Sequence, residues 1–131
     1  LFRSYLSNMK LEHKELTQYF SQQTELIKEI HKQLTEQLDQ RFTIAELSKQ
    51  YLINTSTLKE IFKAVYGQPI ATYMKEFRVR QAMKLLRETN ATIANIASQV
   101  GYQTQGKFSS AFQSIVKMSP REYRKIQGIQ K

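Results

Sequence analysis

Apolar residues recur at intervals of three and four along most of this chain, the spacing of one face of an α-helix. Between residues 24 and 40 they are Leu26, Ile27, Ile30, Leu34 and Leu38. Thr24 is a candidate cap for this helix. Residues 70–88 contain no Gly or Pro and predict one long helix. Its apolar residues fall largely on one face: Tyr73, Phe77, Ala82, Leu85 and Leu86. The pattern predicts an all-α fold with about seven helices between residues 24 and 126.

Residues suited to cap a helix stand where several of the helical patterns begin. Thr43 is followed three residues later by Glu46, which is the pattern of a capping box. Asn54 and Thr104 each lie four residues before an apolar core position. Ser119 is followed by Pro at the first helical position and Glu at the third. The helix boundaries are therefore marked by local sequence as well as by periodicity.

The apolar pattern occurs twice. The matched positions of the first copy are Ile44, Leu47, Ser48, Leu58, Phe62 and Tyr73. The first three are matched 49 positions later and the last three 50 positions later. The second copy therefore has one extra residue between Ala97 and Phe108, where a turn is expected. Each copy predicts a helix-turn-helix, at about 43–67 and about 92–117, with a linker helix at about 70–88 between them.

A heptad-like stripe precedes this repeat. Its members are Phe2, Leu6, Met9, His13, Leu16 and Phe20, spaced 4-3-4-3-4. Such a stripe needs a partner, either a second copy of the chain or an upstream domain. We expect residues 1–23 to be a linker or dimerisation helix from an upstream region, and residues 24–131 to form the main domain. The chain begins without Met inside a helical pattern and is expected to be part of a longer protein.

Charge is distributed unevenly along the 131-residue chain. Its net charge is +9, but residues 1–40 carry −1 and residues 41–131 carry +10. This asymmetry favours a polyanion as partner of the second part, the alternative being a domain that is simply basic. The chain has no cysteine, which excludes disulfides, and no apolar run long enough to span a membrane.

Signals of catalysis or cofactor binding are absent from the sequence. His13 and His31 are 18 residues apart with no cysteine, so we expect no metal site. There is no Gly-rich phosphate loop and no Ser/His/Asp grouping. We therefore expect no cofactor and no enzymatic activity. The aromatic residues follow helical core spacing, which does not favour stacking on single-stranded bases.

These residues resemble the DNA-binding domain of the AraC/XylS family of bacterial transcription regulators over roughly residues 26–125. The second copy and the segment after it carry the most specific part: Ile93, Ile96, Ala97, Val100-Gly101-Tyr102, Phe108, Phe112, Ser119-Pro120 and Tyr123-Arg124. The rest of the match is Leu47, Leu58, Phe62-Lys63, Gly67, Arg78, Ala82, Leu85 and Leu86. Lys117 departs from the pattern, because it stands where the family usually has Gly. Either it strains that helix end or the helix ends differently.

The resemblance implies seven helices, with two recognition helices in successive major-groove segments of double-stranded DNA. It implies cytoplasmic transcription regulation, most often activation, with RNA polymerase as a further partner and a separate sensory domain. A homodimer would form through residues 2–20 or through the upstream domain, and no membrane is involved. Two alternatives remain: an architectural or weakly specific DNA binder, and a helical protein–protein module.

The first recognition helix is expected to bury Leu58, Ile61, Phe62 and Val65. Its expected base-contacting residues are Ser56, Thr57, Lys59, Glu60 and Lys63. Lys59 can donate to guanine O6 and N7, and Glu60 can accept from cytosine N4. Alternatively, Glu60 serves helix capping with Thr57, and Ser56 and Thr57 are merely solvated.

The second recognition helix is expected to bury Phe108, Ala111, Phe112 and Ile115. Its expected base-contacting residues are Gln105, Gly106, Lys107, Ser109 and Ser110. Gln105 can pair with adenine, whereas Gly106 has no side chain to read with but lets the backbone approach DNA closely. Neither helix carries Arg, and we expect weaker, more phosphate-dominated binding by the second unit.

Other basic residues are expected near the DNA backbone. The expected phosphate contacts are Arg41, Lys49, Arg121, Arg124 and Lys125, with ordinary solvated charge as the alternative for each. Arg78 on the linker helix is either a DNA contact or a structural residue that bridges helices.

Overall fold

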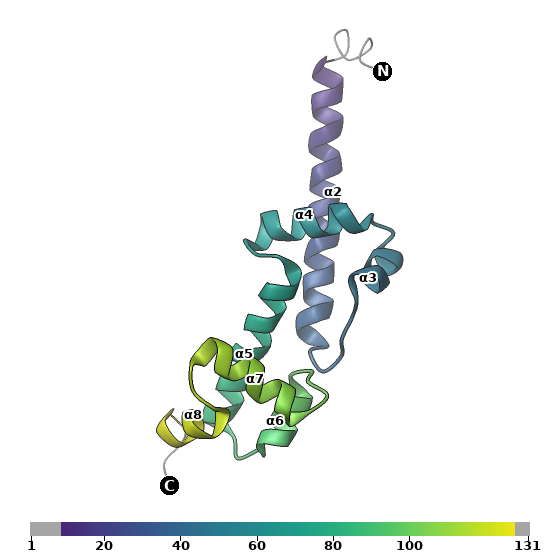
Figure 1. Cartoon of the computed structure of the whole chain (residues 1–131). Coiled ribbons are helices and arrows are strands. Elements are labelled where there is room, and N and C mark those ends of the chain that lie inside the picture. The colour runs from purple at the N-terminus through teal and green to yellow at the C-terminus, as the bar shows by residue number, and fades with distance from the viewer. Residues whose placement is uncertain (1–8, 128–131) are drawn as a thin grey trace.

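The computed structural model describes residues 9–127 and the side chains of residues 14–127. This part of the chain forms seven α-helices: α2 (Met9–Glu36), α3 (Ile44–Tyr51), α4 (Thr55–Tyr66), α5 (Ile70–Glu88), α6 (Ile93–Gln99), α7 (Gln105–Val116) and α8 (Pro120–Gln127). The predicted all-α architecture with two helix-turn-helix units and a linker helix is confirmed. Figure 1 shows α3 and α4 beside the lower half of α2, and α6, α7 and α8 around the far end of α5.

The helix α2 is continuous from Met9 to Glu36, so the described part of the heptad-like stripe shares one helix with the pattern that we predicted separately after residue 24. Thr24 lies inside this helix, and its expected role as a cap is wrong. The physical reason is that no Gly or Pro interrupts the segment between the two patterns.

Only the second half of α2 belongs to the core. Ile27, Ile30 and Leu34 are buried, whereas residues 14–22 are exposed along a part of α2 that projects beyond the other helices (Figure 1). Of the predicted heptad, Leu16 and Phe20 are 54% and 55% exposed. The remaining members, Phe2, Leu6, Met9 and His13, lie outside the described side chains.

The other four predicted caps, Thr43, Asn54, Thr104 and Ser119, are present at their helix starts. Thr43 and Glu46 form a reciprocal capping box, with N···O distances of 2.8 and 3.0 Å. The Asn54 side chain accepts from the amides of Ser56 and Thr57, and Thr104 accepts from the amide of Lys107. Ser119 and Glu122 repeat the capping box before α8. These local bonds satisfy amides that a helix start would leave unpaired.

The two recognition helices end in the same way, although different residues end them. Gly67 closes α4 with φ 83°, and Lys117 closes α7 with φ 70°. Lys117 therefore takes the left-handed conformation despite its Cβ, so of the two outcomes foreseen the strained one is found. Each turn within the two units also contains one left-handed residue, Leu52 in the first and Gly101 in the second.

Two separate cores are joined by α5. The first core consists of Ile27, Ile30, Leu34, Leu47, Ile53, Leu58, Phe62 and Met74. The second consists of Val79, Ala82, Leu86, Ile96, Ala97, Val100, Phe108, Ala111, Phe112 and Tyr123. The first turns of α5 thus serve one unit and its later turns the other. Because one rigid helix enters both cores, it sets the distance between the two units.

Candidate nucleic-acid interface

The recognition helix α4 presents a polar face to solvent. Leu58 and Phe62 are fully buried, which turns the opposite side of the helix outward. Of the residues expected to contact bases, Ser56, Lys59, Glu60 and Lys63 are exposed and Thr57 is half-buried. The buried stripe is narrower than predicted, since Ile61 is half-buried and Val65 is 37% exposed.

The recognition helix α7 repeats this arrangement. Phe108, Ala111 and Phe112 are buried as predicted, and Ile115 is half-buried. Of the residues expected to contact bases, Gln105, Gly106, Lys107 and Ser110 are exposed, and Ser109 is half-buried. A small hollow beside α7 is lined by Gln105, Ser109 and, from the start of α8, Arg121.

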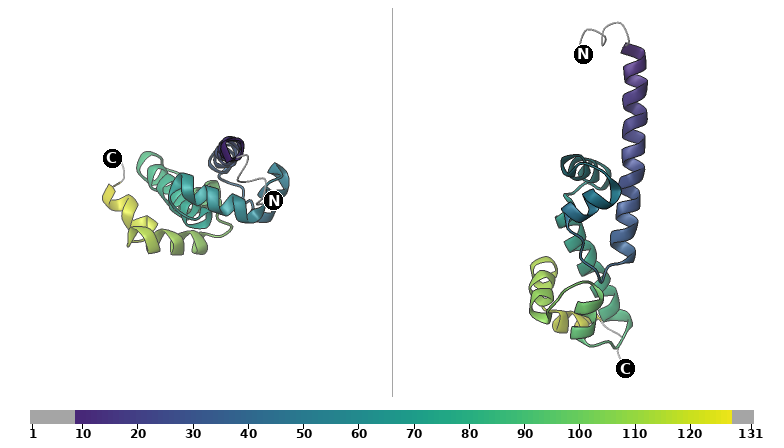
Figure 2. Two further views of the ribbon diagram at one scale, coloured as in Figure 1. Left: turned by 90° about the horizontal axis from the view of Figure 1, so that it is seen from above. Right: turned by 90° about the vertical axis from the view of Figure 1, so that its right-hand side faces the viewer.

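Both recognition helices lie on one side of the molecule. In Figure 1, α4 crosses in front of α2 and α7 crosses in front of α5, and both views in Figure 2 place the two helices on the side facing away from α2. Two exposed polar helix faces therefore point in the same general direction. A single straight partner can contact both at once.

Arg78 on α5 bonds to both units. It is 3% exposed, and its Nη1 donates to the carbonyl of Leu38 in the loop after α2. The same Nη1 donates at 2.7 Å to the carbonyl of Val100, in the turn of the second unit. Nη2 donates to the carbonyl of Gln40 at 3.4 Å. The structural alternative for Arg78 is thus the one found, with the guanidinium bridging elements of the two units.

Burial destabilises the protonated, charged form of the Arg78 guanidinium. Burial first, and repulsion from Arg41 second, lower the pKa of Arg78 to about 10. Its acceptors are neutral carbonyls rather than a carboxylate, and its buried Nε has no hydrogen-bond partner. The side chain therefore stays charged at neutral pH without a full set of partners.

Arg41 makes a second connection between the units. Its Nε donates at 2.7 Å to the carbonyl of Gly101, and its guanidinium lies 4.7 Å from the centre of the Tyr102 ring. These contacts hold the expected phosphate-contacting residue against the turn of the second unit. Its side chain remains exposed, so a phosphate can still reach it.

The remaining expected phosphate contacts lie on α3 and α8. Lys49 is exposed on α3, and Arg121 and Lys125 are exposed on α8. Arg124 is half-buried and donates to the carbonyls of Leu86 and Thr89 at the end of α5. Arg124 therefore has an internal role, which its sequence position did not reveal.

Sequence reasoning missed Lys75, an exposed residue of α5 that lines a cleft between the units together with Arg41 and Tyr102. The sequence pattern presents α5 as a spacer, and a single Lys on the polar side of a helix carries no distinctive signal. Among the described residues, no group of His, Cys, Asp and Glu is arranged to hold a metal ion. No described helix is both long and apolar enough to cross a membrane.

The fold and this surface define a double helix-turn-helix domain. Residues 47–126 match a family described as "Helix-turn-helix domain". A putative AraC-like transcription regulator of Streptomyces lividans is 40% identical over 84 residues, covering 64% of this chain and 28% of that protein. The transcriptional activator RhaR of Mannheimia succiniciproducens is 35% identical over 91 residues, covering 70% of this chain and 33% of that protein.

A solved structure supports the same assignment. The C-terminal domain of AraT, a response regulator from Geobacillus stearothermophilus, superposes with a TM-score of 0.76 at 25% identity. The match covers 81% of this chain and 88% of that one. The chain belongs to the AraC/XylS family of helix-turn-helix domains, which are DNA-binding domains of transcription regulators. It spans about a third or less of the length of the curated relatives it matches.

Proposed function

We propose that α4 and α7 enter successive major-groove segments on one face of duplex DNA. The observation that carries the proposal is that both helices, each with exposed polar residues, lie on the side of the molecule that faces away from α2 (Figure 2). Recognition helices read bases through the residues of their first turns. The base-contacting residues are then Ser56, Thr57, Lys59, Glu60 and Lys63 of α4, and Gln105, Gly106, Lys107, Ser109 and Ser110 of α7.

The two helices differ in what they can read. In α4, Lys59 donates to guanine, and Glu60 accepts from cytosine N4. Exposure of both side chains supports these roles. In α7, Gln105 pairs with adenine, whereas Gly106 offers only its backbone. We expect α4 to contribute more sequence preference than α7.

The backbone contacts in this proposal come from Arg41, Lys49, Arg121, Arg124 and Lys125. Such contacts position a protein on the duplex without reading its sequence. Arg121 is the best placed, because it lines the hollow beside α7 with Gln105 and Ser109. Arg124 contributes through the positive potential of α8, since its guanidinium already bonds to carbonyls of the linker region.

The N-terminal helix and the wider role of the protein complete the proposal. Residues 1–23 link residues 24–131 to an upstream region or dimerise, a role supported by the exposure of Leu16, Tyr19 and Phe20.

The protein acts in the cytoplasm without catalysing a reaction. It activates transcription together with RNA polymerase, and the similarity to RhaR, a transcriptional activator, supports activation.

Selection of bound duplexes from a randomised DNA library, at about physiological salt, tests this function. Two preferred patches about 10 base pairs apart, roughly one helical turn, are the expected result. Enrichment of a single patch would indicate that α7 contacts only the DNA backbone and does not read bases. If DNA were retained but no sequence were enriched, the result would favour architectural binding over sequence-specific recognition. No retained DNA would contradict the proposal and favour a protein–protein module.

A further inference from the structure

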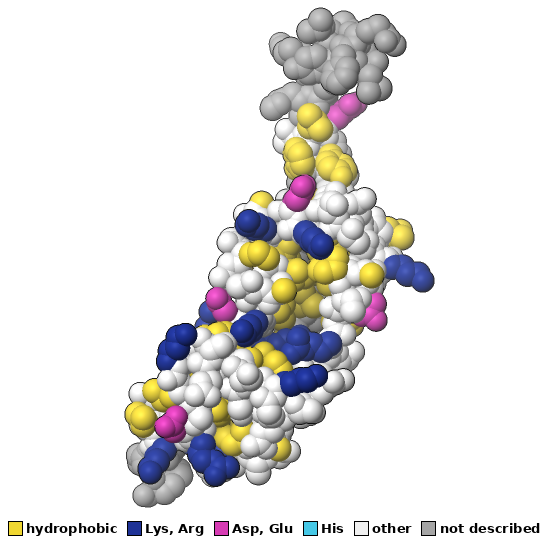
Figure 3. Space-filling model, in the orientation of Figure 1, with side chains coloured by type: hydrophobic (Ala, Val, Ile, Leu, Met, Phe, Trp, Pro, Cys, Tyr) yellow, Lys and Arg dark blue, Asp and Glu magenta, His cyan; other side chains and the backbone are white. Residues whose placement is uncertain are grey.

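An open cleft lies between the two helix-turn-helix units. Its floor is α5, with Ile70, Met74 and Lys75, and residues 41–44 and Tyr102 form its sides. The cleft measures about 480 Å³. Figure 3, in the orientation of Figure 1, shows a hollow with apolar and basic side chains between α4 and α7. The cleft therefore opens on the side that carries the recognition helices.

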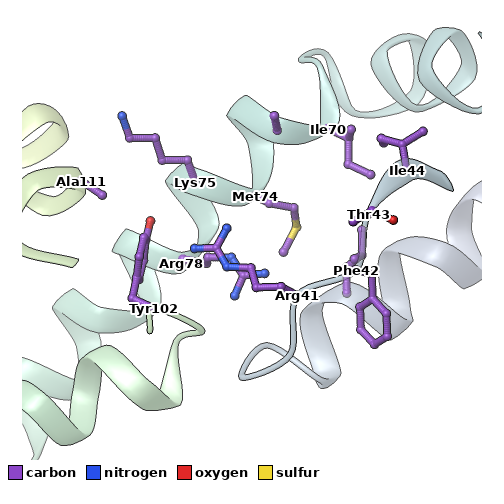
Figure 4. A pocket seen from close by; sticks show the side chains of 12 residues that line it. Arg41, Phe42, Thr43, Ile44, Ile70, Met74, Lys75, Arg78, Tyr102 and Ala111 are labelled. Carbon is purple, nitrogen blue, oxygen red and sulfur yellow. The ribbon is translucent and has the colours of Figure 1, made fainter. Parts of the chain in front are cut away.

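The cleft holds positive charge that no carboxylate balances. Arg41, Lys75 and Arg78 line it, and neither Asp nor Glu is among its lining residues. Within residues 14–127, the ion pairs found do not involve these three cations. Figure 4 shows Lys75 extending from α5 on the side of Ala111, and Arg41 beside Tyr102. Because these cations line one cleft that has no acidic lining residue, the cleft attracts an anion.

The geometry of duplex DNA supplies an anion at this place. Two successive major-groove segments on one face of B-DNA are separated by a minor groove with a sugar-phosphate backbone on each side. A protein that fills both segments must pass over these backbones. The middle of such a bridge is the cleft, because it lies between α4 and α7 on their exposed side.

We propose that this cleft is a third DNA contact, in which Lys75 binds a backbone phosphate beside the minor groove between the two major-groove segments. The inference rests on the proposed function. Lys75 is the exposed cation on the floor of the cleft, and its four-carbon stem lets the ammonium reach out of it. Arg41 is held by Gly101 and Tyr102, and Arg78 is buried, so both act mainly through their positive potential.

Lys75→Gln tests the contact against a matched control, Lys84→Gln. Lys84 is also exposed on α5, but nine residues, or about two and a half turns, separate it from Lys75, so it lies on the opposite face. Both variants lose one surface charge and keep their helix. Affinity for the selected duplex is measured over a range of salt concentrations, and thermal unfolding checks the fold.

We expect Lys75→Gln to weaken binding on the order of five-fold at 0.15 M salt, and to reduce the salt slope by about 0.9. The loss should be the same for all sequences, and Lys84→Gln should bind nearly as the unchanged chain does. Equal effects of the two variants would overturn the inference while leaving the proposed function intact. A loss confined to certain central base pairs would also overturn it, because it would indicate base reading. If the unchanged chain failed to select two patches, the proposed function itself would be contradicted.

A neutral methylphosphonate placed in the DNA backbone midway between the two patches identifies the partner of Lys75. If Lys75 contacts that phosphate, the neutral linkage and Lys75→Gln should each weaken binding by about the same factor. Combining them should then cost no more than either change alone. Fully additive losses at every central phosphate tested would overturn the assignment of Lys75 to the backbone.

Discussion

Nη1 of Arg78 donates at 2.7 Å to the carbonyl oxygen of Val100, so the linker helix is bonded directly to the turn of the second unit. The same nitrogen also donates to the carbonyl of Leu38, at the other unit. One guanidinium thus ties together a loop, a helix and a turn that are far apart in sequence. The relative position of the two recognition helices depends on this group as well as on the length of α5.

Replacing Arg78 by Ala should therefore lower the free energy of unfolding by about 2–4 kcal/mol, since buried carbonyls lose their donors. Arg80→Ala is the control, because Arg80 is exposed on the same helix and pairs with Glu76 at 3.8 Å. An exposed pair of this kind contributes about 0–1 kcal/mol. Urea unfolding measures both variants. Similar losses in the two would contradict a bridging role for Arg78.

Gly101 should not tolerate a side chain. Its φ is 92°, and a Cβ there would overlap Nη1 of Arg78 and the carbonyl oxygen of Leu38. We expect Gly101→Ala to cost about 2–3 kcal/mol of stability, from left-handed strain together with the lost Arg78 bonds.

Gly106→Ala is the matched control for that change. Gly106 lies in the first turn of α7, where an added Cβ would meet only Oγ1 of Thr104, at 4.0 Å. Because Ala favours helix more than Gly does, this variant should gain up to about 0.5–1 kcal/mol. Thermal and urea unfolding compare the pair. A stabilising Gly101→Ala would refute the close approach of Arg78.

Lys59→Ala and Lys107→Ala distinguish sequence reading from backbone binding. If Lys59 pairs with guanine, its removal should cost about 1–3 kcal/mol at one base position and relax the preference there. Lys107 should show a smaller, more uniform loss, because the second unit is expected to be dominated by phosphate contacts. Binding to a panel of single-base variants of the selected duplex measures both. Uniform losses for Lys59→Ala would assign it to the backbone instead.

His31 should make stability fall on the acid side of neutrality. Its Nε2 lies 2.7 Å from the hydroxyl of Tyr73, its ring stacks on Tyr66, and burial lowers its pKa below 6.5. Between the folded-state pKa and 6.5 the unfolded chain therefore binds more protons. Stability is then retained above about pH 6.5 and lost as the pH falls through that value toward the folded-state pKa.

His31→Gln should remove this contribution while keeping a polar side chain. Urea unfolding at several pH values between about 7.5 and 5 compares its slope with that of the unchanged chain. The variant should lose less stability on acidification. Parallel pH profiles would show that His31 does not supply the dependence. His13 is common to both proteins and cancels from the comparison.

Local sequence predicted a large part of the fold because helix starts depend on neighbouring residues. The capping residues Thr43, Asn54, Thr104 and Ser119 all bond to amides two or three residues away, so their pattern could be recognised without a structure. The way in which α5 contributes to both cores was harder to predict. Its buried face includes Arg78, which apolar periodicity does not count.

The sequence by itself determined the helices, their caps, the doubled helix-turn-helix pattern and the basic second part, because these follow from periodicity, local hydrogen bonds and composition. Only the tertiary structure decided that Arg124 serves the end of α5 and that Lys75 lines a cleft beside Arg41. These features depend on contacts between residues tens of positions apart. Such contacts form when α5 joins two cores, and no local pattern encodes them.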